Sequence, residues 1–289
     1  MSGSDSATYY AYKPSLAAAV VFIVLFFLTV ILHIYQTSRT RSWFWIPFIT
    51  GGIFEIIGYL GRAINATETR YEWSFGPFVI QTLFILLAPV LFAASMYMML
   101  GRIALVSGSE HKLIIRRSWL TKIFVLGDIL AFFVQAVGGV MLTQTSASAA
   151  SRGQKIVLVG LFIQIIFFGL FITTALVFAM RAFNGSRKAP WRSALIVLIF
   201  GSTLIMVRCI YRVVEYIQGK SGHIMSHEAF IYVFDASLMF IVMILSNTMH
   251  PSMIGARIKG GVVVRLWAVK EIIETSATSM ETLGYHETD

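Results

Sequence analysis

The chain has 289 residues, of which 57% are hydrophobic and only 13% are charged, and its formal net charge is +9. Ordinary soluble domains carry about 25% charged residues, so the composition excludes a soluble enzyme, and the high hydrophobicity excludes disorder over most of the chain. The single cysteine, Cys209, excludes an internal disulfide and any site with several cysteine ligands.

Seven apolar segments are each long enough to cross a bilayer, which takes about 20 residues. The first is longer than the apolar core of a cleaved signal peptide, about 7–15 residues, so we expect it to remain as a span. The sequence therefore predicts an all-α seven-transmembrane helix bundle over residues 15–251, with an N-terminal tail (1–14) and a largely disordered C-terminal tail (252–289). The seven segments cover residues 15–35, 43–63, 77–101, 119–142, 156–180, 193–217 and 228–249.

Lysine and arginine are distributed unevenly over the predicted loops. Fourteen of them lie after the first, third and fifth segments or in the C-terminal tail, and five lie on the other side. Because such an excess marks the cytoplasmic side of a membrane protein, we expect the N-terminus outside and the C-terminus in the cytoplasm. The same distribution accounts for the net positive charge without a nucleic-acid partner.

Several predicted spans carry polar or ionisable residues at helical spacing. A charged side chain in the middle of a span costs about 2.5–3.5 kcal/mol on insertion scales, and is usually paired or functional. Residues at i, i+4 and i+7 share one helix face. The residues concerned are Glu55, Tyr59 and Arg62; Gln81; Asp128 and Gln135; Arg208, Tyr211, Arg212 and Glu215; and Glu228 and Asp235.

The expected topology places most of these residues in the outer half or the middle of the membrane. We therefore predict one polar cluster between the second, third, sixth and seventh spans, opening outward, with Asp128 deeper. Two interpretations remain open. Either the cluster lines a cavity for a polar or amphipathic ligand, or it is a structural network of ion pairs that locks the bundle.

Motifs of catalysis are weak or absent. His223 and His227, followed by Glu228, have a spacing that can bind zinc on a helix face, but no HExxH motif is present. The chain also lacks a P-loop and a GxSxG nucleophile elbow. We expect no enzymatic activity, no cofactor and no metal; His223 and His227 are the weak metal-ligand candidates, and a metal-dependent hydrolase would need Glu228 and Asp235 to lie beside them. Asn65 begins a glycosylation sequon very close to the membrane, and we do not expect it to be used.

The polar motifs, taken together in chain order, resemble those of one known family. From about Tyr12 to Ser252 the chain resembles the RTA-like proteins, fungal seven-span membrane proteins also called the lipid-translocating exporter family. The resemblance rests on Glu55-x-x-Gly58-Tyr59-x-x-Arg62, Gln81 to Pro89 with Tyr97 and Arg102, Gly127-Asp128 with Gln135 and Gly138-Gly139, Arg208-x-x-Tyr211-Arg212-x-x-Glu215, Glu228-x3-Tyr232-x-x-Asp235, and His250-Pro251.

The resemblance implies a membrane transporter or exporter of lipids or toxic amphiphiles, such as sphingoid long-chain bases, usually in the plasma membrane. Its partners would be membrane lipids and an amphipathic small molecule. Two alternatives remain: a seven-span sensor or receptor, and an intramembrane metal-dependent lipid hydrolase. The candidate ligand-binding residues come from the polar stripes, and Tyr232 joins them through the motif it shares with Glu228 and Asp235.

Overall fold

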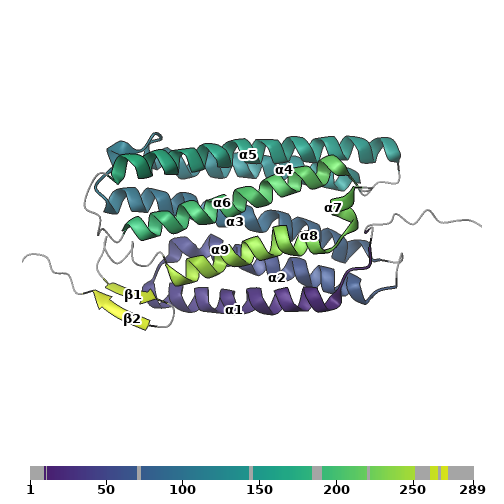
Figure 1. Cartoon of the computed structure of the whole chain (residues 1–289), viewed down its shortest axis with the longest axis horizontal. Helices are drawn as coiled ribbons and strands as arrows, with labels where there is room; N and C mark the ends of the chain where they lie inside the picture. The colour runs from purple at the N-terminus through teal and green to yellow at the C-terminus, as the bar shows by residue number, and fades with distance from the viewer. Residues whose placement is uncertain are drawn as a thin grey trace, which may run out of the picture.

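The structure is a computed structural model of the chain. It describes residues 10, 12–69, 73–142, 146–183, 191–219 and 222–250, and the backbone of 261–265 and 268–272. Within these residues, seven helical spans are long and apolar enough to cross a membrane. They lie side by side along the long axis of the molecule (Figure 1), and each coincides with one predicted segment. The prediction of a seven-helix membrane protein is confirmed.

The first six spans are continuous helices, and the seventh is assembled from three shorter pieces. Short 3-10 turns, Trp43–Trp45 and Glu110–Lys112, and the short helix α7 (His223–Ser226) lie in the connections. The spans are α1 (Leu16–Thr40), α2 (Ile46–Thr67), α3 (Phe75–Val106), α4 (Arg117–Leu142), α5 (Ala147–Ala182) and α6 (Trp191–Gln218), and then α8 (Ala229–Ile231), a π-helical segment (Tyr232–Ala236) and α9 (Ser237–Thr248).

The side chains of the bundle are sorted in the way expected for a protein surrounded by lipid. Large apolar side chains point outward, as Phe27, Leu126 and Met180 do, each more than half exposed. Polar side chains such as Glu55 and Asp235 are fully buried. Because hydrocarbon cannot hydrogen-bond to polar groups, this arrangement suits a multi-pass membrane protein.

Glycines on α2 allow it to approach α3 closely. A Cβ atom added at Gly58 would lie 2.5 Å from Cγ1 of Ile85, and one at Gly61 would lie 2.7 Å from the carbonyl oxygen of Pro77. Such distances are too short for any larger residue without rearrangement. The close packing holds Glu55 and Arg62, which lie on the same helix, near α3 and the bundle interior.

The C-terminal tail contains two short strands. Strands β1 (Gly261–Arg265) and β2 (Ala268–Ile272) form an antiparallel hairpin in which Val263 pairs with Lys270. The hairpin lies at the end of the bundle where α1 finishes (Figure 1). Consecutive β-branched valines favour a strand at this position. The other residues of that tail lie outside the described residues.

Candidate functional site

A cavity of about 290 Å³ lies at one end of the bundle. We call this end the N-terminal face, because α1 begins there and α2, α4 and α6 end there. Thr82 and Leu86 of α3 and Gly139 and Leu142 of α4 contribute to the walls of this N-terminal cavity. The charged or ionisable residues that line it are Arg62, Arg212, Glu215 and His227 together with Tyr10, Tyr12, Tyr211 and Tyr216.

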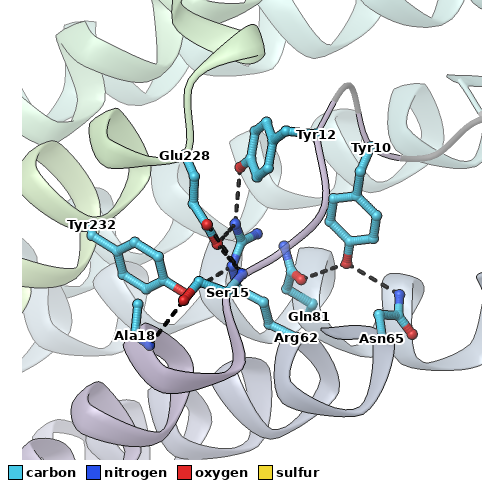
Figure 2. Close-up of polar contacts among 9 residues, drawn as sticks. All are labelled: Tyr10, Tyr12, Ser15, Ala18, Arg62, Asn65, Gln81, Glu228 and Tyr232. Atoms are coloured by element: carbon cyan, nitrogen blue, oxygen red, sulfur yellow. Dashed lines mark hydrogen bonds and ion pairs between the residues drawn. The ribbon is translucent and has the colours of Figure 1, made fainter. Parts of the chain in front are cut away.

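Arg62, almost fully buried, is the centre of a first set of ionic contacts, the Arg62 group. Its guanidinium forms an ion pair with Glu228 at 2.7 Å and donates hydrogen bonds to the hydroxyls of Tyr232 (3.0 Å) and Tyr12 (2.9 Å). The backbone N–H of Ser15 also donates to Glu228, at 2.8 Å. Figure 2 shows these side chains converging from α2, the seventh span and the N-terminal segment. The N-terminal segment is thereby tied to both spans.

The N-terminal segment covers this end of the bundle with two tyrosines. The Tyr10 hydroxyl donates to Gln81 at 2.7 Å and accepts from the Asn65 amide at 3.1 Å (Figure 2). Burial raises the pKa of Tyr10 to about 12 and also raises the pKa of Tyr12, so both stay neutral at physiological pH. Their carbon rings each lie within 6 Å of the Arg62 guanidinium, where cation–π attraction holds it.

These two tyrosines are site residues that the sequence reasoning missed. The aromatic residues ahead of the first span were the available signal, because aromatic side chains next to a span often lie at its interface. The same contact involves the glycosylation sequon. Asn65, the first residue of the sequon, is fully buried and its amide nitrogen is bonded to Tyr10.

A second set of contacts, the Asp235 group, lies deeper in the bundle. Asp235 is fully buried and forms ion pairs with both Arg208 and Arg212. Arg212 also pairs with Glu215 at 2.9 Å, and the Tyr211 hydroxyl donates to the same carboxylate at 3.3 Å. The polar residues of α6 at positions i, i+4 and i+7 therefore lie against the seventh span. The predicted cluster needs these two spans to be neighbours.

Pro89 explains one further contact of Arg208. Proline has no N–H, so inside α3 it leaves the carbonyl of Ile85, four residues earlier, without its helical hydrogen bond. The Arg208 guanidinium donates to that carbonyl at 2.7 Å. α3 continues through the proline, and the arginine of α6 replaces the missing donor.

The seventh span contributes to both groups. Glu228 and Tyr232 contact Arg62, whereas Asp235 contacts the arginines of α6. Tyr232 and Asp235 lie in the π-helical segment. Such segments are rare and occur frequently at functional sites. A rearrangement of this one segment would change both groups together.

Glu55 lies beside the Asp235 group without joining its hydrogen bonds. It is fully buried, and neither carboxyl oxygen has a hydrogen-bond partner among the described residues. The charged groups that act on it are Asp235, Arg208 and Arg212. The hydroxyl of Tyr59, one turn further along α2, is also buried without a partner in the described part of the chain.

Asp128 and Gln135 do not take part in either group, and their inclusion in the predicted cluster requires correction. Asp128 accepts a hydrogen bond from Tyr97 at 2.6 Å, and Gln135 donates to Gln164 at 3.0 Å. Neither lines the cavity. The reason is helix packing: α4 packs mainly against α5 and α3, so its polar face meets those helices instead of α2 and the seventh span.

The two candidate metal ligands lie in and next to α7. The rings of His223 and His227 are 4.2 Å apart and pack against Phe230. His227 lines the cavity. Among the residues that the structure describes, no group of three or more His, Cys, Asp or Glu side chains is arranged to hold a metal ion. The geometry therefore offers no support for the hydrolase alternative.

Comparison with known proteins places the chain in a family. The family model described as "RTA1 like protein" matches residues 48–257, which is more than half of the chain. The chain belongs to the RTA1-like family. All the α2, α3, α6 and seventh-span residues of the two groups lie inside this match, whereas Tyr10, Tyr12 and Ser15 precede it. No solved structure matches.

Curated RTA1-like relatives cover most of the chain. "Protoporphyrin uptake protein 1" of Saccharomyces cerevisiae is 35% identical, over 84% of this chain and 92% of that protein. "Probable lipid transporter atnI" of Emericella nidulans is 34% identical, over 83% of this chain and 66% of that protein. "Sphingoid long-chain base transporter RSB1" of Saccharomyces cerevisiae is 24% identical, over 86% of this chain and 74% of that protein.

Proposed function

We propose that this protein is a membrane transporter of lipids or other amphiphiles, and that the N-terminal cavity is its cargo site. The observation that carries the proposal is the cavity, which has apolar walls on α3 and α4 and charged side chains from α2 and α6. Such a site can hold a polar head group at the charged wall while an apolar tail follows the helices toward the lipid.

The names of the relatives support the same class of cargo. A lipid transporter, a sphingoid long-chain base transporter and a protoporphyrin uptake protein all handle molecules with a polar part and a large apolar part. All three are named for movement of a molecule, which agrees with our expectation that this chain is not an enzyme. The sensor alternative has no comparable support.

A cationic head group suits the acids at this end of the bundle. Glu215 lines the cavity, and Glu228 is paired with Arg62, which also lines it. An incoming ammonium would compete with the arginines for these carboxylates, and its affinity depends on how much each ion pair loosens. We place the cavity at the outer leaflet, following the positive-inside distribution, and we place the protein in the plasma membrane, as the resemblance to the RTA-like family implies.

Reconstitution tests this function. Purified protein in liposomes is expected to speed the movement of a labelled sphingoid base between leaflets or out of the vesicles. Glu228→Gln, which removes the charge that faces Arg62, is expected to slow this movement at least several-fold. Glu110→Gln serves as the control, because Glu110 is exposed and pairs with Arg117 at the other end of the bundle. Wild-type vesicles that move the base no faster than empty ones would contradict the proposal.

A further inference from the structure

The buried and partly buried ionic groups at the N-terminal face do not balance in charge. The Arg62 group, the Asp235 group and Glu55 together contain four carboxyl groups and three guanidinium groups. If every carboxyl is ionised, the assembly carries one excess negative charge. In a low-dielectric interior such an excess is costly unless a proton or another cation neutralises it.

Glu55 is the carboxyl group that would carry the excess negative charge. Glu215, Glu228 and Asp235 each contact an arginine directly, whereas Glu55 has no hydrogen-bond partner among the described residues and no exposed surface. An ionised carboxylate buried without a partner costs several kcal/mol, so the neutral acid is the favoured form in this structure. A proton on Glu55 would remove the excess charge, whereas each of the neighbouring acids is already paired with an arginine.

The groups around Glu55 connect it to the cavity. α6 brings Arg208 and Arg212, and the seventh span brings Asp235. On α2 itself the nearest titratable group is Tyr59, whose buried hydroxyl has no partner in the described chain. Arg212 both pairs with Asp235 and lines the cavity. A charge that enters the cavity and a charge on Glu55 thus act on the same arginine–aspartate pair.

We propose that Glu55 is an exchangeable proton site, and that binding of a cationic amphiphile in the N-terminal cavity releases this proton. The proton leaves to water as the ammonium enters, so the net charge of the assembly is unchanged. Either cation removes the single excess charge, but both together would leave an uncompensated positive charge. Binding of the proton and binding of the cargo therefore exclude each other, and a proton gradient can drive transport of the cargo. This inference rests on the proposed function and supplies its energy source.

A permanently charged probe tests the exchange. Dodecyltrimethylammonium carries no proton of its own, so any proton that appears on binding comes from the protein. Its binding to the purified full-length protein is measured by calorimetry in buffers of different ionisation enthalpy. We expect the release of about one proton per ligand, and a Kd that rises by up to about tenfold for each pH unit below the titration of Glu55.

Three variants make the test specific. Glu55→Gln mimics the protonated acid, so it is expected to bind the probe weakly, with no proton release and no pH dependence. Glu55→Asp keeps an ionisable group and is expected to restore the release. Asp128→Asn makes the same chemical change at a buried acid that neither lines the cavity nor contacts Arg208, Arg212 or Asp235, and it is expected to behave as the wild type. Thermal unfolding checks that each variant is folded.

The outcomes separate the exchange from transport itself. Binding of the probe without proton release, or release that persists in Glu55→Gln, overturns the exchange proposal. If the same preparation still moves a labelled zwitterionic lipid, transport of amphiphiles stands while the exchange is rejected. If it neither binds nor moves any amphiphile, both proposals fail. Should Glu55→Gln not fold, the pH series on the wild type and Glu55→Asp decides the matter alone.

Discussion

The two ends of the bundle solve the problem of buried polar groups differently. At the N-terminal face, charged side chains from α2, α6 and the seventh span pair with one another beside a cavity. At the opposite end, neutral polar side chains from α1 are buried against the end of the seventh span, and none of them lines that cavity. The first arrangement places charged side chains next to the N-terminal cavity, and the second joins helices through neutral contacts.

The contacts of the opposite end show how it works. Gln36 donates to the backbone carbonyl of Asn247 at 2.9 Å, His33 contacts the carbonyl of Met243 at 3.2 Å, and His250 lies 3.5 Å from the Thr37 hydroxyl. These bonds run largely to backbone, carry no net charge and hold α1 against α9. Burial of polar side chains is thus common to both ends, and the proposed cargo site differs from the opposite end in having charged side chains beside a cavity.

The largest expected effect comes from breaking the Asp235 group. Asp235→Asn leaves Arg208 and Arg212 without their shared carboxylate, and loss of one partner of a buried ion pair costs about 3–5 kcal/mol. Asp128→Asn, where the amide oxygen can still accept from Tyr97, is expected to cost less than about 2 kcal/mol. Unfolding in detergent measures both. Equal losses would show that the Asp235 group is no more important to stability than an isolated hydrogen bond.

Arg62 is expected to affect transport more than any residue at the opposite end. Arg62→Gln removes the charge that holds Glu228 and releases Tyr12, and we expect the transport of a labelled sphingoid base to fall by about tenfold, a change of ~1.4 kcal/mol. Gln36→Leu at the opposite end is the comparison. Vesicle transport corrected for the amount of folded protein measures both. A larger transport defect in Gln36→Leu would reverse the assignment of the cargo site.

Acid should weaken the opposite end through His250. Burial lowers the pKa of His250 to about 3, whereas an unfolded histidine titrates near 6.5. Below about pH 6.5 the unfolded chain binds a proton that the folded chain excludes. The free energy of unfolding therefore decreases as the pH is lowered, by up to ~1.4 kcal/mol per pH unit, until about pH 3. Above that window His250 contributes no pH dependence. Unfolding of the wild type and His250→Gln at pH 7 and pH 5 measures this, and identical pH slopes would contradict it.

The smallest effect is expected at Tyr12, one of the two tyrosines of the N-terminal segment that cover Arg62. Tyr12→Phe keeps the ring over Arg62 and loses one hydrogen bond, which is worth about 0.5–1.5 kcal/mol. We expect a modest drop in stability and faster entry of cargo, because the N-terminal segment is held less firmly. Rates of probe binding by stopped flow compare Tyr12→Phe with Tyr35→Phe, a control on α1 away from the cavity. Slower entry in Tyr12→Phe would contradict a covering role.

Much of the fold was predictable, because the bilayer imposes strong and simple rules. Residues such as Arg62 and Asp235 stand out in apolar segments, and their helical spacing predicted that they face inward together. Asp128 looked equivalent by the same rules, yet it pairs with Tyr97. Hydropathy and spacing report which face of a helix is polar, but not which neighbouring helix that face meets.

The sequence by itself determined the seven spans, the polar stripes of α2 and α6, and the charge asymmetry of the loops, since these follow from local composition and helical period. Only the tertiary structure decided that Asp235 takes two arginines, that Tyr12 reaches Arg62, and that Glu55 has no hydrogen-bond partner among the described residues. These contacts join residues far apart in the chain. Their partners depend on how whole helices pack, which no local pattern of residues encodes.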